Sequence, residues 1–422
     1  MVRVHYFRAH IARALADALN AESGRVYTDV LVRHWRIYRR HGHWLSRKAA
    51  SKLQDAELGR PALLHSHSLD AAREGLYNAC KTARECRKQG LDNKYPFRRK
   101  RFRPTVWKNT AIRKDGDTLL LSLARGNEPI RARLPDGLCD LSADAFREVK
   151  LVYNRCGWYE WHVAVEDGRE PEDAPGDRVV AIDPGEIHPL SLTDGEETLI
   201  VIARELRAVK QRRNKKLAEI QHKQAAKVKG SRAWWRLQRA KNRLLAKTQR
   251  QQRDIEHKVS RAAAEWVRER KAGTAAFGDV RDVGDGKRLN RKSQQKVSQW
   301  THGKVRVYFT YKVEECGIKV ELQDEAYTTR TCPRCGHEHK PRGRVYACPV
   351  CGLRAHRDAV GAANILSLYL EGEMGHIQPT EPKYRQPFRK GRPRRSPEDT
   401  GQVAAAERRL SRRKSVEAPH IQ

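Results

Sequence analysis

The sequence predicts a multidomain α/β protein, and three features of its 422 residues support that class. Residues 1–92 repeat apolar side chains at helical spacing, whereas residues 105–166 alternate apolar and polar side chains as strands do. A polar and acidic stretch, residues 167–177, is the clearest linker in the chain. Two C-x-x-C motifs near the C-terminus have the spacing of a zinc site. We therefore expect separate N-terminal and C-terminal parts.

Residues 1–92 are predicted to form helices. Ile11, Leu15 and Leu19 recur at four-residue steps, and a further helix is expected over Leu69–Lys88. Trp35 lies in a segment where arginines alternate with apolar residues. Such an aromatic side chain usually packs in a core, but the interleaved arginines also fit a surface that contacts a nucleic-acid backbone.

The segment Tyr95–Pro104 separates the helical region from the strands. Two prolines prevent a helix here, and basic residues alternate with phenylalanines. The pattern is typical either of a solvated surface or of a groove that follows a nucleic-acid strand. The candidate nucleic-acid contacts are Arg98, Arg99, Lys100, Arg101 and Arg103.

Residues 105–166 are predicted to form two hairpins. The first joins Thr118–Leu123 to Pro129–Leu134 through an Arg-Gly-Asn turn, and the second is closed around Gly157. Four such strands predict a small barrel or sheet.

The C-terminal part opens with the apolar strand Arg178–Asp183, which is followed by Pro-Gly. Asp-Pro-Gly after a strand is by itself an ordinary turn. Residues 201–270 follow as a basic helical hairpin that is broken near Gly230. Its second arm carries an apolar stripe with core spacing.

The two C-x-x-C motifs predict a structural zinc ribbon. Zinc binds four thiolates in a tetrahedron, and a C-x-x-C turn supplies two of them from one knuckle. The predicted ligands are Cys332, Cys335, Cys348 and Cys351. Two disulfides are the alternative, which requires an oxidising compartment. The other five cysteines are scattered singly, as in proteins of a reducing cytoplasm.

Composition indicates a polyanionic partner. The chain has 86 Lys and Arg against 51 Asp and Glu, a formal net charge of +35 and a pI near 10.2. A charge of this size favours binding to nucleic acid. No apolar run approaches the ~18 residues that a membrane-spanning helix needs.

Residues 354–366, R-A-H-R-D-A-V-G-A-A-N-I-L, follow the second knuckle. An acidic residue at a helix start, such as Asp358, is usually a cap. Together with the ribbon, however, this stretch resembles the C-terminal part of TnpB, the transposon-encoded family of RNA-guided nucleases related to type V CRISPR effectors. In that family the ribbon precedes the last acidic residue of an RNase-H-like RuvC nuclease. The resemblance implies that Asp358 is the third catalytic carboxylate and that Asp183, in a D-P-G at the first strand, is the first.

The residue patterns and the resemblance together predict a domain order. The parts are a helical recognition region (residues 1–92), a β-rich barrel-like wedge (93–166), the linker (167–177), a RuvC-like nuclease (178–330) that carries the hairpin 201–270, the zinc ribbon (331–353) and the last RuvC helix (354–370). The prolines and many arginines that follow predict a disordered basic tail (371–422).

The second acid departs from the family pattern. TnpB proteins usually have a strand that ends in a catalytic glutamate where this chain has Gly278-Asp279. Some members of the family take the glutamate from just before the entry to the ribbon, where this chain has Glu325. Glu325 is the favoured candidate, and Asp279 and Glu321 are the alternatives.

The resemblance implies Mg²⁺-dependent cleavage of DNA by Asp183, Glu325 and Asp358, beside structural Zn²⁺. Two-metal nucleases need carboxylates that converge on two ions ~4 Å apart. The implied partners are a guide RNA from the transposon end and target DNA, in a prokaryotic cytoplasm at the nucleoid. No membrane and no obligatory protein partner is expected. Two alternatives stay open: a nuclease-inactive RNA-guided DNA-binding protein, and a zinc-ribbon, transposase-like DNA-binding protein that works without RNA.

Overall fold

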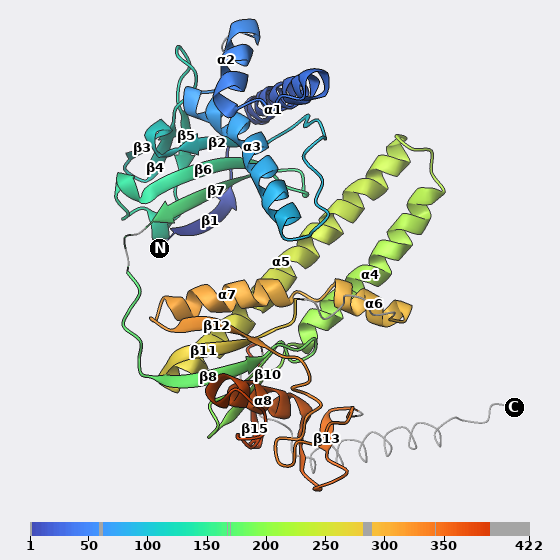
Figure 1. The fold of residues 1–422 in the computed structure, drawn as a ribbon. Coiled ribbons are helices and arrows are strands. Elements are labelled where there is room, and N and C mark those ends of the chain that lie inside the picture. The colour runs from blue at the N-terminus through green and yellow to red at the C-terminus, as the bar shows by residue number, and fades with distance from the viewer. Residues whose placement is uncertain are drawn as a thin grey trace, which may run out of the picture. The chain divides into compact units, whose positions relative to one another are not determined.

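A computed structural model of the chain describes residues 2–58, 62–166, 168, 170–281, 289–341 and 343–388. The chain divides into two compact units (Figure 1). The first contains Met1–Glu172 and Arg212–Arg250, and the second contains Asp173–Gln211 and Gln251–Gln422. The division after Glu172 falls within the predicted linker. The other two divisions fall within the long helices α4 (Arg204–Ala225) and α5 (Arg232–Glu269) of the hairpin.

The first unit combines helices with antiparallel sheets. Its helices are α1 (Arg13–His41), α2 (Arg47–Leu58) and α3 (Ser66–Lys88). A four-stranded sheet has the order β1-β7-β6-β2, formed by β1 (Val2–Arg8), β7 (Tyr159–Glu166), β6 (Phe146–Tyr153) and β2 (Thr105–Lys108). A three-stranded sheet contains β3 (Ile112–Asp115), β4 (Thr118–Leu121) and β5 (Ile130–Arg133). Short 3-10 helices cover Asn109–Ala111, Asp136–Leu138 and Ala143–Ala145.

The strands of this unit enclose an aromatic core. Trp107, Phe146 and Trp161 are almost completely buried, and the apolar residues of both sheets pack around them. Pairing among the described residues groups the strands into two sheets, so a closed barrel stays a prediction.

The expectation that residues 1–92 are helical throughout is wrong at the start of the chain. Val2–Arg8 forms β1, which pairs antiparallel with β7 from Val2↔Glu166 to Arg8↔Glu160. The sequence V-R-V-H-Y-F-R does alternate with period two, as a strand should. Its partner lies about 160 residues away in the chain, so no local hairpin signal marks it.

The second unit is built on a six-stranded sheet of order β12-β11-β8-β9-β10-β15. Its strands are β8 (Arg178–Asp183), β9 (Leu190–Thr193), β10 (Thr198–Val201), β11 (Ala272–Asp279), β12 (Lys319–Asp324) and β15 (Pro382–Arg385). β8, β11 and β12 are parallel, whereas β9 is antiparallel to both of its neighbours. The other elements are α6 (Arg291–Ser298), α7 (His302–Glu314), β13 (Val345–Ala347), β14 (Arg354–His356) and α8 (Arg357–Glu371).

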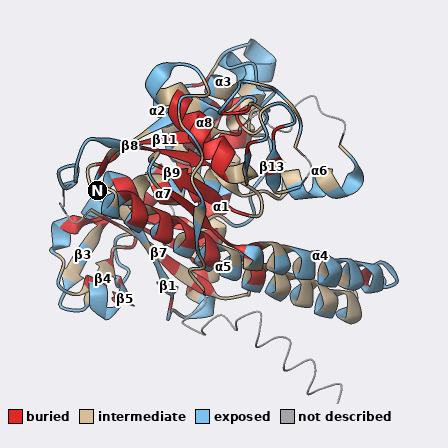
Figure 2. Cartoon of the chain, turned by 90° about the horizontal axis from the view of Figure 1, so that it is seen from below, coloured by how far each residue is buried: buried red, intermediate tan, exposed pale blue. Residues whose placement is uncertain are grey.

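Helices cover both faces of this sheet. Val180 and Ile182 of β8 pack against apolar residues of α5 and α7. Ala181 points to the other face, where it packs with Ile365 and Leu366 of α8. Successive side chains of a strand alternate between faces, so Asp183 lies on the α8 face. The buried residues, red in Figure 2, include most of α8 and the strands against which it packs.

The described part of the C-terminal tail is ordered, which corrects the prediction of disorder from residue 371. β15 pairs in parallel with β10, and the Arg385 guanidinium donates to the carbonyl of Ala262 at 3.2 Å. Pro382 begins the strand at the sheet edge, where the missing backbone N–H is tolerated. Residues 389–422 lie outside the described part of the chain.

Candidate functional site

Three parallel strands of the second unit end at one edge of the sheet. β8 ends at Asp183, β11 at Asp279 and β12 at Asp324, with Glu325 directly after it. The register aligns Asp279 with Asp324. Because parallel strands present their carboxyl ends together, four acidic residues gather at this edge.

Asp183 is enclosed between the end of β8 and the first turns of α8. Its exposed fraction is 8%. A β-carbon built on Gly361 of α8 would lie 2.6 Å from the Asp183 Oδ2 atom. Only glycine at position 361 therefore lets the helix approach the carboxylate this closely.

Asp358 lies in the first turn of α8 and acts on Asp183. Burial raises the pKa of Asp183 well above its usual range, and the charges of Asp358 and Glu325 raise it further. Burial also acts to raise the pKa of Asp358, but the hydrogen bond with His188 and nearby positive charge, including that of Arg357, outweigh it and lower that pKa. Asp183 therefore resists ionisation more than Asp358 does.

Glu325 reaches over β11 into the space beside Gly278. A β-carbon at Gly278 would lie 3.1 Å from the Glu325 Oε2 atom, 3.1 Å from Pro184 and 3.1 Å from Ile365. The structure thus brings Asp183, Glu325 and Asp358 together, and the absent side chain at position 278 leaves room for the Glu325 carboxylate.

The two alternative acids point elsewhere. Asp279 forms an ion pair with Arg281 and lies 3.9 Å from the Arg306 Nη1 atom, and the hydrogen bond with Arg281 lowers its pKa. Glu321 accepts a hydrogen bond of 2.9 Å from Tyr369, near the other end of α8. Tyr369 follows Asp358 by eleven residues, about 16 Å along a helix. Neither carboxylate is among the charges that act on Asp183.

A cleft of about 910 Å³ opens at the same edge of the sheet. Glu325 lies on its wall together with Arg281, Tyr327 and Arg330. The Tyr327 side chain is exposed, and the Arg330 guanidinium stacks over its ring at 5.5 Å. An arginine and an aromatic ring beside carboxylates can contact the phosphates and bases of a nucleic-acid strand.

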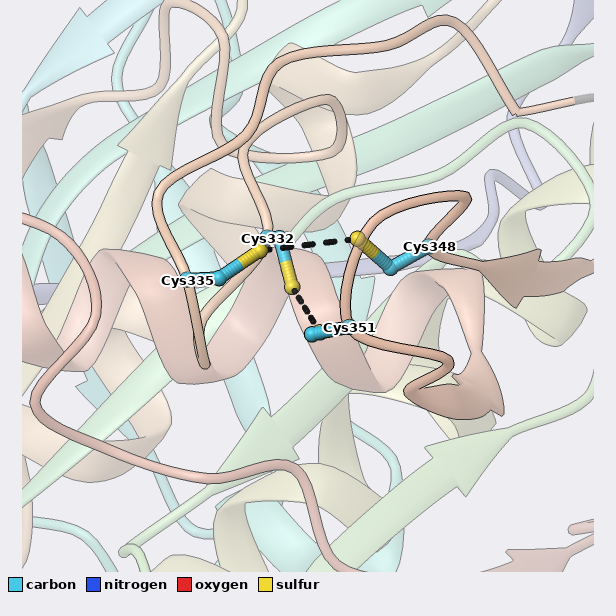
Figure 3. A group of neighbouring side chains, drawn as sticks. All are labelled: Cys332, Cys335, Cys348 and Cys351. Carbon is cyan, nitrogen blue, oxygen red and sulfur yellow. Dashed lines mark hydrogen bonds between the residues drawn. The ribbon is translucent and has the colours of Figure 1, made fainter.

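The four predicted zinc ligands converge (Figure 3). The sulfur atoms of Cys332 and Cys351 are 3.5 Å apart, and those of Cys335 and Cys348 are 3.6 Å apart. These distances are far too long for disulfides. Zn–S bonds of about 2.3 Å place tetrahedral ligands about 3.8 Å apart, so the cluster fits zinc. A hydrogen bond from the Cys351 amide contributes most to lowering the pKa of Cys348, to about 6, which favours the thiolate.

The ribbon is held to α8 by buried contacts. The Asn364 side-chain amide donates to the carbonyls of Thr328 and Thr331, both at 2.8 Å. Val360 of α8 packs with Cys332 and Tyr346 of the ribbon. The entry to the ribbon is therefore fixed to the helix that carries Asp358.

The sequence analysis did not identify His188. It lies five residues after Asp183, between β8 and β9, and it is 3% exposed. Its Nδ1 atom is 2.6 Å from Asp358 Oδ2. The available signal was a histidine close to the D-P-G turn, which by itself does not indicate a partner about 170 residues away.

The basic segment of the first unit lies along α1. Thr28 exchanges two hydrogen bonds with the backbone of Lys100, and the Trp35 indole donates to the carbonyl of Pro96. The exposed residues are Arg98, Arg99, Lys100 and Arg101. Arg103 differs, because it donates to the carbonyl of Ala71 and stacks over Tyr27. Arg103 is thus engaged by contacts within the fold, and its role in nucleic-acid contact stays a prediction.

Across the described residues, every helix is either too short or too polar to cross a lipid bilayer.

Two family models match the chain. The model described as "Probable transposase" matches residues 162–283, and the model "Cas12f1-like, TNB domain" matches residues 302–365. The first matched range includes strands β8 to β11 of the second unit, and the second includes the four clustered cysteines.

Relatives and a solved structure agree with these matches. The chain is 27% identical over 229 residues to the putative RNA-guided DNA endonuclease InsQ of Escherichia coli, which covers 51% of this chain and 55% of InsQ. It is 31% identical over 81 residues to a TnpB-like protein of Methanocaldococcus jannaschii, covering 18% of this chain and 29% of that protein. The matches thus span about half, or less, of the length of these relatives.

The fold is shared with Cas12f1 in its complex with single-guide RNA and target DNA. The TM-score is 0.57 at 14% identity, over 84% of this chain and 83% of that one. A likeness at this level of identity establishes the mixed α/β fold and not the activity. The family models and the relatives confirm the resemblance to the TnpB family that residues 354–366 indicated.

Proposed function

We propose that this protein is an RNA-guided DNA endonuclease of transposon origin, in which a RuvC-like centre hydrolyses phosphodiesters. The observation that carries the proposal is the convergence of Asp183, Glu325 and Asp358 at the carboxyl end of one parallel sheet. The name of the relative InsQ, a putative RNA-guided DNA endonuclease, supports the same activity.

The donor set fits Mg²⁺. Magnesium prefers hard oxygen ligands and is bound by a few carboxylates together with substrate phosphates. Asp183 has a raised pKa because it is buried next to two other carboxylates, and a bound cation would relieve that repulsion. Asp183, Glu325 and Asp358 are therefore the proposed magnesium ligands.

Bound Mg²⁺ would stabilise the attacking and leaving oxygens of the hydrolysis. The residues of this chain orient the reaction. Gly361 and Gly278 leave the space in which Asp183 and Glu325 meet, and His188 holds one oxygen of Asp358. Tyr327 and Arg330 line the adjoining cleft, where they would contact the nucleic-acid strand that enters it.

We assign zinc to the four cysteines as a structural ion. All four positions of the tetrahedron are filled by protein thiolates, which leaves none for substrate. In the first unit, the exposed residues Arg98, Arg99, Lys100 and Arg101 would neutralise phosphates of RNA or DNA. The proposed partners are a guide RNA from the transposon end and the DNA with which it pairs.

The test is cleavage by the protein purified with its bound RNA. Wild type should cut DNA that matches this RNA in the presence of Mg²⁺ and not in its absence. Asp183→Ala, Glu325→Ala and Asp358→Ala should each reduce cutting on the order of 100-fold or more, equal to about 2.7 kcal/mol of transition-state stabilisation. Binding to matching DNA should persist.

Asp279→Ala is the matched control, because this acid ends the neighbouring strand but pairs with Arg281. It should cut as wild type does. Loss of cutting in Asp279→Ala, with normal cutting in Glu325→Ala, would refute the assignment of the second acid.

Gly278 favours a second candidate, a nuclease-inactive protein that uses RNA to bind DNA. It predicts guided binding without cutting in the wild type. A third, favoured by the match to the transposase model, is DNA binding without RNA. Sequencing of the RNA that copurifies with the protein tests this third candidate, because both of the RNA-guided candidates require a discrete bound RNA and the third does not.

A further inference from the structure

Two side chains, Arg344 and His188, link the cysteine ribbon to Asp358. The Arg344 Nη1 atom lies 2.6 Å from His188 Nε2, and His188 Nδ1 lies 2.6 Å from Asp358 Oδ2. His188 is almost completely buried, and Asp358 is 15% exposed. The contact therefore joins the ribbon, the turn after β8 and the start of α8 inside the protein.

The direction of the hydrogen bonds follows from the chemistry of arginine. A guanidinium group only donates, so His188 Nε2 must accept. The imidazole proton is then on Nδ1, which donates to the Asp358 carboxylate. Arg344 in this way fixes both the tautomer and the orientation of His188, and His188 fixes one oxygen of Asp358.

Arg344 takes its position from the folded ribbon. It precedes β13, which pairs with β14, and it lies four residues before Cys348. Its carbonyl accepts a 2.7 Å hydrogen bond from the backbone N–H of Arg357, the residue before Asp358. Tyr346, two residues on, is packed among the zinc-binding cysteines.

The cluster is not itself a cation site. Ligand atoms of His188, His356 and Asp358 all lie within 4.8 Å of one another, as in a transition-metal centre. The Arg344 guanidinium, however, occupies the Nε2 side of His188, and the Nδ1 side lies against Asp358. Both nitrogens of His188 are therefore already engaged, which leaves neither of them for a transition metal.

We propose that Arg344 is a positioning residue of the metal centre, which orients Asp358 through His188 and so makes metal binding there depend on the folded zinc ribbon. The inference rests on the proposed function, because it takes Asp358 as a magnesium ligand. Partners of this kind typically change metal affinity or activity by about 10- to 100-fold.

The test measures metal binding directly. Mn²⁺ replaces Mg²⁺ so that bound ion can be counted by electron paramagnetic resonance, using the protein with its RNA. Ions bound by the RNA are subtracted with the Asp358→Ala complex. Arg344→Ala and His188→Ala should each weaken the remaining Mn²⁺ binding about tenfold or more. Both should raise the Mg²⁺ concentration needed for half-maximal cutting.

Arg354→Ala is the matched control, because it removes an exposed arginine from the paired strand of the same ribbon. It should bind Mn²⁺ as wild type does. Arg344→Ala should keep its zinc and its melting temperature, which separates positioning from a folding defect. The Arg344→Ala/His188→Ala double variant should be no weaker than His188→Ala alone, since Arg344 acts through His188.

Unchanged Mn²⁺ affinity in Arg344→Ala, or losses that add in the double variant, would overturn the inference while wild type still binds Mn²⁺ and cuts. If Arg344→Ala loses zinc in proportion to Mn²⁺, its role is to fold the ribbon and the inference is likewise wrong. If wild type neither binds Mn²⁺ above the background nor cuts, the proposed function itself fails.

Discussion

At the scale of single residues, two glycines determine how closely the carboxylates approach one another. Gly361 lets the first turns of α8 pack on Asp183, and Gly278 leaves space for Glu325. Enclosing carboxylates in this way costs free energy when no cation is bound, because ionised groups lose hydration and repel each other. That cost is measurable.

Asp183→Asn should raise the melting temperature of the protein at pH 7 in buffer without Mg²⁺. The pKa of Asp183 is raised in the fold, so its ionisation opposes folding. Wild type therefore loses stability as pH rises from about 4, the pKa of an unfolded aspartate, through the folded value. Asp183→Asn has an amide at this position, which does not ionise, so the variant does not lose this stability.

The gap between the two melting temperatures should therefore be larger at pH 7 than at pH 4. A gain of about 1 kcal/mol corresponds to roughly 2–4 °C for a unit of this size. Thermal melts at both pH values measure it, and a gap that does not change with pH contradicts the prediction. Mg²⁺ should stabilise wild type and not the variant.

The position of the second acid can be tested by moving it. Glu325→Ala should reduce cutting on the order of 100-fold or more, and adding Gly278→Glu should raise the rate about tenfold above that of Glu325→Ala, equal to about 1.4 kcal/mol. Gly278 lies on the same face of the sheet as Asp183, and the Glu325 carboxylate vacates the space beside it. The control is Gly278→Glu with Glu325 retained, which should cut poorly because two carboxylates compete for one space.

At the scale of elements, the second unit depends on helices that pack on opposite faces of one sheet. α8 carries Asp358 on one face, while α5 and α7 support the other face. Between α5 and α7, the His257 ring stacks on Tyr308 with the ring centroids 4.0 Å apart, and the Lys312 ammonium lies 3.5 Å from the Nδ1 atom of His257. Because a protonated His257 would be repelled by Lys312, this packing favours the neutral form of the histidine.

His257 should make the protein sensitive to acid. Burial, together with the nearby Lys312, lowers its pKa to about 4. The folded pKa is below the unfolded value of about 6.5, so the stability that neutral His257 contributes is lost as pH falls from 6.5 towards 4. His257→Phe keeps an aromatic ring against Tyr308 and should flatten this part of the pH dependence in urea unfolding.

His222→Asn is the control, because His222 is exposed on α4. It should leave the acid dependence as it is. An unchanged slope between pH 6.5 and 4 in His257→Phe would mean that another group is responsible.

At the scale of the whole molecule, the net charge of +35 favours long-range attraction to polyanions, of which the proposed partners RNA and DNA are examples. Part of this charge lies beyond β15: residues 389–422 contain ten Lys and Arg against four acidic residues. β15 itself belongs to the sheet, so the chain can be cut after Phe388 without removing a described strand.

Removal of residues 389–422 should weaken RNA binding at low salt and reduce its salt dependence. Each phosphate contact contributes a slope of about −0.7 to log K against log salt concentration for single strands. The truncated protein should keep its melting temperature and its discrimination between matched and mismatched DNA. Filter-binding titrations over a salt series measure the slope, and an unchanged slope would exclude the tail from binding.

The sequence alone located several parts of the site because their chemistry is local. The C-x-x-C pairs predicted the cysteine cluster, and the apolar run before Asp183 predicted a strand that ends at that residue, as β8 does. The mixed α/β class and the resemblance to the TnpB family were likewise predicted from local patterns, and both are confirmed. The pairing of Val2–Arg8 with β7 and the strand at Pro382–Arg385 were missed, because their partners are far away in the chain.

What the sequence by itself determined about this protein is which residues can bind metal and which segments become strands or helices, because spacing and side-chain type set those properties within a few residues. Only the tertiary structure decided that Glu325, and not Asp279 or Glu321, approaches Asp183, and that Arg344 reaches Asp358 through His188. These contacts depend on which face each strand turns to α8 and on where parallel strands end. A local pattern does not carry that information, since it arises when distant segments pack against one another.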